Sequence, residues 1–247
     1  SKIVIQSIIP IISIVAIVVV VIVFIMWRYS AHLTRAMQQL QNFIVKVEGG
    51  NFKTELGRKV AERNDELGMI GRSAVQMQAA LRELVERDSL TGLYNRHYGE
   101  YWLREMKKEA GRTGISFYVA IADIDHFKNF NDQYGHDCGD MVLKQVSKVL
   151  DETMRPGGYA ARWGGEEFLL IFSEKGEEQA IDRVNGIVEK IRSLKMRYGE
   201  QELSITVTIG FVSGDAKKHE DELFKMADKA LYEGKENGRD QVRAFEV

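Results

Sequence analysis

The sequence contains a single cysteine and two prolines in 247 residues, and two common nucleotide-binding motifs are missing from it. Cys138 alone cannot form an intrachain disulfide, so we expect it to be a small buried hydrophobe in a protein of a reducing compartment. Neither a Gly-x-x-x-x-Gly-Lys-Ser/Thr motif nor a Gly-x-Gly-x-x-Gly motif occurs, which leaves a Walker ATPase and a Rossmann enzyme unsupported.

A charge excess of either sign is also missing. Lys and Arg total 34 and Asp and Glu total 36, which gives a formal net charge of -2. Without a basic excess the chain has no overall field that would attract nucleic acid. We therefore expect no nucleic-acid partner, and any bound polyanion must be held by local groups.

Charged side chains are absent from residues 3–27. A helix of this length measures about 37 Å at 1.5 Å per residue, which exceeds the roughly 30 Å hydrocarbon core of a bilayer. The run predicts a transmembrane helix over residues 1–27. A signal peptide is the alternative, but the apolar stretch is long for one and no small-residue cleavage site follows it.

Basic residues flank this run unequally. Arg28 and Arg35 follow it, whereas only Lys2 precedes it. The positive-inside tendency then places the larger C-terminal part in the cytoplasm, with the chain crossing the inner membrane once. The sequence begins at Ser1 and not at a methionine, which is compatible with an extracytoplasmic portion before it.

Two apolar seams with alternating steps of three and four residues follow the membrane run. Such steps average 3.5 residues and are typical of a left-handed coiled coil, which one chain cannot bury alone. We therefore expect a homodimer. The seams are Leu33, Met37, Leu40, Ile44 and Val47, and then Leu67, Ile70, Ala74, Met77, Leu81 and Leu84.

The glycine-rich residues 48–68 separate the two seams and are expected to run back along the bundle, so that both helices are parallel. This arrangement directly after a membrane helix, with NDELG opening the second helix, resembles the HAMP signal-relay module over residues 28–84. The resemblance implies a sensor that is absent from this chain or supplied by a partner. A plain dimerisation stalk is the alternative.

Helical and extended patterns alternate from residue 85 to residue 247. Their order, with an internal hairpin, predicts an α/β (α+β) domain with helices packed on a layered sheet. We expect helices over residues 95–113, 140–154, 177–198 and 221–238, and strands over 115–125, 159–163, 168–172, 203–212 and 241–246.

Carboxylates gather at the predicted strand ends. Asp123 and Asp125 follow YVAIA, and Glu166 and Glu167 stand in RWGGEEF. Two like charges 4 Å apart repel by about 4 kcal/mol at an effective dielectric constant of 20. A hard divalent cation such as Mg²⁺, with a phosphate substrate, would remove that penalty.

The two adjacent glutamates do not suit a glycosidase acid/base pair, because neighbouring residues of extended chain point to opposite faces. A simpler alternative stays open, in which Gly164 and Gly165 form a two-residue hairpin turn and the glutamates are only solvated. Residues 123–140, DIDHFKNFNDQYGHDCGD, are expected to form a loop whose backbone N–H groups face phosphates.

Three motifs now identify a resemblance. GGEEF at 164–168 is similar to the signature of the GGDEF family of diguanylate cyclases, DSLTGLYNR at 88–96 resembles its domain-opening motif, and residues 123–140 resemble its substrate loop. The resemblance implies a fold like that of nucleotidyl cyclases and polymerase palms. It also implies condensation of two GTP into cyclic di-GMP and two pyrophosphates, between two facing catalytic domains.

The resemblance assigns roles to individual residues. Two Mg²⁺ per site, or Mn²⁺ in their place, would be bound by Asp123, the Ile124 carbonyl and Glu166. Glu166 would also help to deprotonate the attacking 3′-hydroxyl, and Glu167 would support it. The remaining implied substrate contacts are Lys128 and the backbone near Phe127 for phosphates, Lys235 and Arg239 for the terminal phosphates, Asn131 and Asp140 for guanine, and His136, which either contacts substrate or only fixes the loop.

One motif departs from the family. Many members carry Arg-x-x-Asp before the signature, where cyclic di-GMP binds and inhibits, but here the stretch runs from Arg155 to Gly158 and ends in glycine. We therefore expect weak or absent product inhibition. A non-catalytic receptor for GTP or cyclic di-GMP is the competing class, although such receptors usually lose the signature that is intact here.

Overall fold

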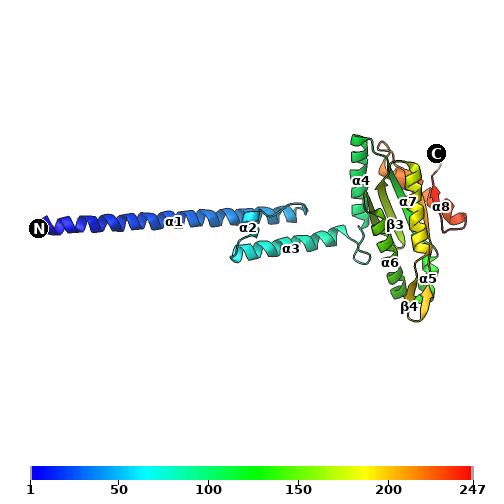
Figure 1. The fold of residues 1–247 in the computed structure, drawn as a ribbon, viewed down its shortest axis with the longest axis horizontal. Coiled ribbons are helices and arrows are strands. Elements are labelled where there is room, and N and C mark those ends of the chain that lie inside the picture. The colour runs from blue at the N-terminus through cyan, green and yellow to red at the C-terminus, as the bar shows by residue number, and fades with distance from the viewer. Residues whose placement is uncertain (1, 246–247) are drawn as a thin grey trace. The chain divides into compact units, whose positions relative to one another are not determined.

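The computed structural model describes the backbone of residues 2–245 and the side chains of residues 14–245 (Figure 1). The chain divides into two compact units, Ser1–Glu83 and Leu84–Val247.

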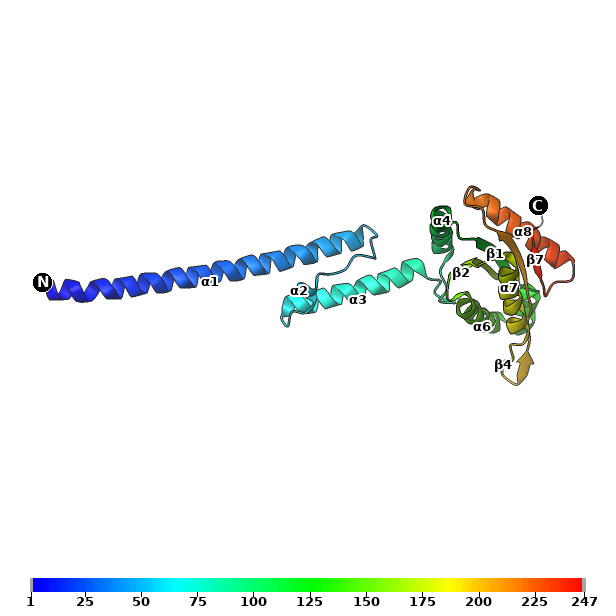
Figure 2. The same ribbon diagram turned by 45° about the horizontal axis from the view of Figure 1, so that its top comes forward.

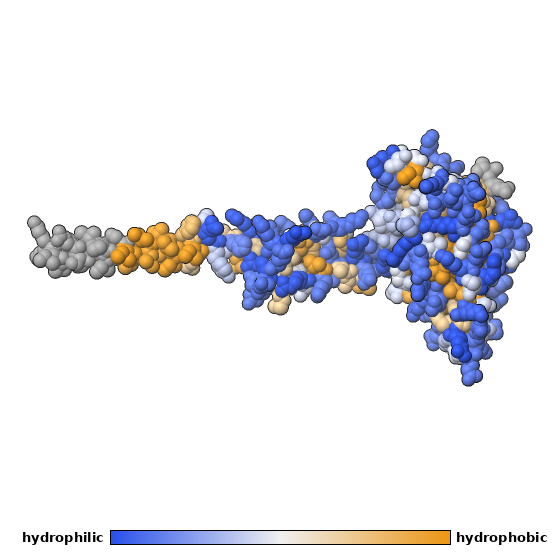
Figure 3. Space-filling model, in the orientation of Figure 1, coloured by the Kyte–Doolittle hydropathy of each residue, from blue (hydrophilic) through white to orange (hydrophobic). Residues whose placement is uncertain are grey.

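The first unit begins with one long helix, α1, over Lys2–Glu48. Its part Ile14–Glu48 is long and apolar enough to cross a membrane, and Figure 3 shows the apolar band on this helix. Residues 1–13 of the predicted span lie outside the residues whose side chains are described. The helix does not end where the apolar run ends, so the first seam continues the same helix.

The connector after α1 contains the short helix α2, Arg58–Ala61, and leads into α3, Glu66–Glu86. It is fastened to α3 by Gln78, whose Nε2 donates to the carbonyls of Phe52 at 3.0 Å and Thr54 at 2.8 Å. Gln78 is only 8% exposed. The glycine-rich segment is therefore a packed connector and not a free linker.

Apolar seam side chains of this unit remain uncovered in the single chain. Ile70 is 48% exposed and Met77 is 64% exposed, whereas Leu40 is buried at 7%. Exposed apolar residues repeated along a helix are typical of interaction surfaces.

The second unit contains a five-stranded sheet in the order β2-β3-β1-β6-β7. β1 pairs antiparallel with β3 and β6, β2 pairs antiparallel with β3, and β7 pairs parallel with β6. The elements are α4 Arg96–Thr113, β1 Phe117–Ile124, α5 Phe127–Tyr134, α6 His136–Met154, β2 Gly158–Gly164, β3 Glu167–Ser173, α7 Glu177–Arg192, β4 Met196–Tyr198, β5 Gln201–Leu203, β6 Val207–Ser213, α8 Glu220–Glu236 and β7 Val242–Ala244.

Helices cover both faces of this sheet, α6 and α7 on one and α4 and α8 on the other (Figure 2). β1 is buried along its whole length because its alternate side chains serve two cores. Ala120 and Ala122 belong to the core under α6 and α7, and Val119 and Ile121 to the core under α4 and α8. Each fully buried large apolar side chain contributes about 1.5–3 kcal/mol. The predicted α/β class, with helices on a largely antiparallel sheet, is confirmed.

Two predicted elements differ from the structure. The helix expected over residues 177–198 ends at Arg192, and residues 196–198 form β4, which pairs with β5. This pairing buries Met196 and Leu203, each 5% exposed, and Gly199 takes a φ of 60° at the turn. The expected strand over 203–212 is correspondingly divided between β5 and β6.

Candidate active site

The centre of the candidate site is a pair of carboxylates on neighbouring strands. Asp123 of β1 is the direct antiparallel partner of Glu167 of β3, so both side chains leave the same face of the sheet. Asp123 is only 7% exposed. Its Oδ2 lies 2.9 Å from Nζ of Lys235, which comes from the end of α8. The cation offsets a like-charge pair that would otherwise destabilise the two strands.

The charge of Asp123 reflects these neighbours. Burial raises the pKa of its carboxyl, the hydrogen bond and charge of Lys235 lower it, and the negative charges of Glu166 and Glu167 raise it again, with a net increase. Both glutamates therefore lie close enough to Asp123 to act on its charge. A site in which one carboxylate is forced toward its neutral form favours the binding of further positive charge.

The signature turn differs in one detail from the expected geometry. Gly164 pairs with Glu167, so the two turn residues are Gly165 and Glu166, and not Gly164 and Gly165 as in the simpler alternative. Gly165 has a φ of 51°, a conformation that favours glycine. The carbonyl of Glu166 accepts a hydrogen bond from the backbone N–H of Ile124 at 3.3 Å. This bond ties the turn to the end of β1, next to Asp123.

Arg162 fastens the turn from the other side. Its Nε and Nη2 donate to the Gly165 carbonyl at 3.1 and 2.9 Å. Its Nη1 reaches the Asp88 carboxylate at 3.2 Å. Asp88 also accepts hydrogen bonds from the backbone and hydroxyl of Thr91. Burial alone would raise the pKa of Asp88, but the bonds from Thr91 and Arg162 lower it overall.

The sequence pattern alone assigns no role to Arg162 or Asp88. Both stand in motifs that it singled out, RWGGEEF and DSLTGLYNR, and their opposite charges were the available signal. The sequence does not show that these two residues, 74 positions apart, contact each other.

The expected loop at 123–140 is instead two helices. α5 starts at Phe127, directly after His126, which has a φ of 56°, and α6 starts at His136. Only Gly135, with a φ of 84°, separates them. Lys128 is exposed on the first turn of α5, where backbone N–H groups are free of intrahelical partners, and Phe127 beside it is buried.

Asn131, His136 and Asp140 form a second group at the junction of α5 and α6. Oδ1 of Asn131 is buried and has no hydrogen-bond partner among the described residues. A Cβ at Gly139 would lie 1.9 Å from that oxygen, so only glycine leaves room for it. His136 and Asp140 are exposed on the first turns of α6. An unpaired buried carbonyl oxygen next to an exposed carboxylate suits a ligand that brings N–H donors.

Asp125 does not join the other carboxylates. Its two oxygens accept hydrogen bonds at 2.7 Å from the hydroxyls of Thr208, in β6, and of Thr206, just before β6. Our grouping of Asp125 with the cluster was wrong, because this residue follows the last residue of β1 and both of its carboxylate oxygens are used by Thr206 and Thr208.

Arg239 lies beyond α8 in a short turn and has a φ of 63°. Its backbone N–H donates to the Gly234 carbonyl at 3.0 Å. Four residues earlier, Lys235 contacts Asp123, so the same segment supplies both predicted cations.

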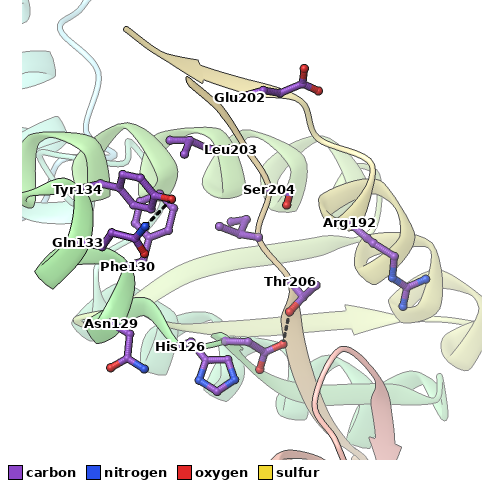
Figure 4. Close-up of a pocket in the computed structure, with 12 residues that line it drawn as sticks. His126, Asn129, Phe130, Gln133, Tyr134, Arg192, Glu202, Leu203, Ser204 and Thr206 are labelled. Carbon is purple, nitrogen blue, oxygen red and sulfur yellow. Dashed lines mark hydrogen bonds between the residues drawn. The ribbon is translucent and has the colours of Figure 1, made fainter. Parts of the chain in front are cut away.

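A cavity of about 460 Å³ lies beside α5, between that helix and the β5–β6 segment (Figure 4). Its lining includes His126, Asn129, Tyr134, Arg192 and Thr206, but none of the carboxylates Asp123, Glu166 and Glu167. The carboxylate centre is therefore separate from this cavity.

The donor set at the carboxylates fits a hard divalent cation. Asp123, Glu166 and the Ile124 carbonyl all belong to the two backbone segments joined by the Ile124 to Glu166 bond, and all offer oxygen. In residues 14–245 no three or more acidic, His or Cys side chains converge as one metal-binding group. A set of two carboxylates and one carbonyl does not require such a group.

The profile of the family described as "Diguanylate cyclase, GGDEF domain" matches residues 85–241. Diguanylate cyclase DosC of Escherichia coli is 33% identical over 183 residues, which cover 70% of this chain and 39% of DosC. Diguanylate cyclase A of Treponema denticola is 31% identical over 201 residues, 80% of this chain and 53% of that protein. The chain thus spans roughly two fifths to one half of these relatives.

Solved structures show the same fold. The GGDEF domain of DgcB from Caulobacter crescentus in complex with c-di-GMP has a TM-score of 0.63 and 34% identity, and the match covers 66% of this chain and 96% of that one. Diguanylate cyclase SiaD of Pseudomonas aeruginosa, in complex with its activator SiaC, has a TM-score of 0.64 and 32% identity. The match covers 85% of this chain and 80% of that one. The active GGEEF domain of a diguanylate cyclase from Vibrio cholerae has a TM-score of 0.58 and 29% identity. That match covers 63% of this chain and 99% of that one.

Proposed function

The chain belongs to the GGDEF family of diguanylate cyclases, and we propose that it condenses two GTP into cyclic di-GMP with release of two pyrophosphates. The observation that carries this proposal is the carboxylate centre: Asp123 and Glu167 are cross-strand partners, Glu166 is tied to the end of β1, and Lys235 contacts Asp123. Merely solvated glutamates would not require the close pairing of Glu167 with the buried Asp123.

In each condensation step the 3′-oxygen of one GTP attacks the α-phosphorus of the other, and the bond to the leaving pyrophosphate breaks. Asp123, Glu166 and the Ile124 carbonyl would hold the magnesium ions, two per site, with Mn²⁺ as a substitute. Bound there, the metal would supply positive charge to the triphosphate and the leaving group. Glu166 accepts the proton of the attacking hydroxyl, directly or through water, and Glu167 supports it from the adjacent strand position.

Phosphate and base are bound by different elements. Lys128 and the free N–H groups near Phe127, at the start of α5, face the phosphates, and Lys235 and Arg239 bind the terminal ones. Asn131 and Asp140 accept the N–H donors of guanine, which is supported by the unpaired buried oxygen of Asn131. An adenine edge would present a different donor pattern to these acceptors, so the group selects GTP.

Catalysis would occur between two catalytic units of a homodimer. Support comes from the apolar seam residues that a single chain leaves exposed, among them Ile70 and Met77. In this proposal α1 anchors the dimer in the inner membrane, residues 28–84 form a HAMP-like relay, and the catalytic unit is cytoplasmic. A sensor outside this chain would then change the geometry between the two units without touching the pocket.

The family's site for inhibition by the product cyclic di-GMP would be missing. A Cβ at Gly158 would lie 2.7 Å from Cβ of Phe172 and 3.0 Å from two backbone oxygens. No aspartate fits there without a shift of the strand, and Arg155 is paired instead with Asp151 one turn earlier in α6.

The decisive experiment incubates the full chain, in detergent or nanodiscs, with GTP and Mg²⁺ and follows cyclic di-GMP by mass spectrometry. We expect product from the native chain and none from Glu166→Gln. A verified dimer that binds GTP but forms no product would instead favour the non-catalytic receptor.

A further inference from the structure

The turn after α8 has an unusual backbone. Gly238, Arg239 and Asp240 have φ values of 109°, 63° and 49°, so three consecutive residues are in the left-handed half of conformational space. Two of them are not glycine, and a side chain makes this conformation unfavourable. Consecutive residues of this kind persist only where surrounding contacts impose them.

Part of that support comes from within the segment. Nε2 of Gln241 donates to the carbonyls of Gly234, Asn237 and Arg239 at 3.0, 3.0 and 3.2 Å. These bonds close the turn on the end of α8. They do not determine how the turn lies against the sheet.

Asp240 is held from two other elements. Its backbone N–H donates to Oδ2 of Asp125 at 3.1 Å. Arg192, the last residue of α7, donates from Nε to Oδ2 of Asp240 at 2.7 Å and from Nη2 to the Asp240 carbonyl at 3.1 Å. The strand end and the helix end therefore fix the residue that directly follows Arg239.

Asp125 is itself buried and bonded on both of its carboxylate oxygens. It is 7% exposed, and its two oxygens also accept the hydroxyls of Thr206 and Thr208. Figure 4 shows Thr206, whose hydroxyl donates to Asp125, and the Arg192 side chain at the edge of the same cavity. Arg192 donates both of its hydrogen bonds to Asp240 and none to Asp123, Glu166 or Lys235 among the described residues, so we expect its effect on the reaction to pass through Asp240.

We propose that Arg192 and Asp125 are positioning residues that hold the left-handed turn at Asp240. They thereby orient the side chain of Arg239 toward the terminal phosphates of the nucleotide. The inference rests on the proposed function only for the role of Arg239. The side chain of Arg192 is 49% exposed, and exposed ion pairs contribute little to global stability. Loss of the Arg192–Asp240 ion pair is therefore expected to change the orientation of the Arg239 side chain and not the fold.

The test uses the full chain and the variant Arg192→Met, with Asp240→Asn as a milder second variant, because asparagine tolerates the left-handed conformation. We expect Arg192→Met to raise the KM for GTP about tenfold, the equivalent of one charge-assisted bond pair, while kcat stays within about twofold. Lys195→Met is the matched control, since Lys195 is exposed and lies 3.6 Å from its partner Glu202.

A double-mutant cycle assigns the effect to Arg239. In an Arg239→Ala background, Arg192→Met should change the KM for GTP no further, because the side chain that Arg192 positions is already absent. An undiminished effect in that background, or an unchanged KM in the single variant, would overturn the proposal.

Binding measurements separate this proposal from the proposed function. The probes are a GTP analogue with a methylene bridge between the α- and β-phosphorus atoms, and GMP, which lacks the terminal phosphates. Arg192→Met should weaken the analogue about tenfold and leave GMP unchanged. That result would support the positioning role even if the native chain formed no cyclic dinucleotide, whereas equal weakening of both probes would refute it.

Discussion

Arg162 joins Asp88, at the opening of the catalytic unit, to the turn that carries Glu166. The guanidinium uses three nitrogens, two for the Gly165 carbonyl and one for the Asp88 carboxylate. Because Asp88 lies two residues after the end of α3, this side chain connects the start of the unit directly with its candidate catalytic turn.

We expect Arg162→Met to lower the rate of cyclic di-GMP formation by one to two orders of magnitude, on the order of 1–3 kcal/mol for the lost charge-assisted bonds. The measurement is the initial rate with GTP and Mg²⁺, together with a thermal melt. Arg112→Met is the control, because Arg112 only pairs with Glu109 on the exposed side of α4. A variant with full activity would show that the turn holds its shape without Arg162.

The pairing of Asp123 with Glu167 predicts opposite effects of one substitution on stability and on activity. Glu167→Gln removes a like charge directly across from Asp123, which should stabilise the unit by about 0.2–1 kcal/mol. Activity should fall moderately, whereas Glu166→Gln should abolish it. Denaturant unfolding and turnover are measured on the same preparations. A destabilised Glu167→Gln would mean that the carboxylate has a favourable partner of its own.

Gly139 should control the guanine site. Gly139→Ala places a methyl group 1.9 Å from the Asn131 oxygen and must displace that oxygen. We therefore expect the KM for GTP to rise about tenfold, as for the loss of one buried hydrogen bond. Gly186→Ala is the matched control, because Gly186 is also a helical glycine and an added methyl group would meet no neighbouring side chain or strand within 4 Å. That change should stabilise α7 by about 1 kcal/mol. Equal KM values for the two variants would remove Asn131 from the guanine site.

Product inhibition through the Arg155 to Gly158 stretch should be weak or absent. We expect initial rates to be insensitive to added cyclic di-GMP at low micromolar concentration, and Arg155→Ala to behave like the native chain. Inhibition at that concentration that disappears in Arg155→Ala would contradict the steric argument at Gly158.

The relay should depend on its exposed seam. Met77→Asp combined with Leu81→Asp places charge where a coiled-coil partner would pack, and we expect loss of the dimer and at least a tenfold loss of activity. Light scattering of the detergent-solubilised chain gives the oligomeric state, and turnover is measured in parallel. Lys59→Asp, in the connector, is a control for added negative charge. A monomeric variant with native turnover would show that the stalk is passive.

Much of the architecture was predictable because it depends on local pattern. The apolar run, the helical seams and the alternation after residue 85 each follow from periodicity in a short window. The failures have local causes as well: the end of α7 at Arg192 was missed because residues 193–198 continue a helical pattern, and only pairing with β5 makes residues 196–198 a strand. The HAMP-like relay, the homodimer and the residue roles at the site stay predictions.

The sequence by itself determined the family, through three motifs in order, and it supplied most of the candidate side chains of the site. Only the tertiary structure decided which of them meet. Asp125 turns to Thr206 and Thr208 while Asp123 faces Glu167, Gly165 and not Gly164 is the first residue of the turn, and Arg162 and Arg192 hold segments far away along the chain. The physical reason is that the direction of a strand side chain follows from the register of the sheet, and register is fixed by the packing of the whole core, not by the residues of one motif.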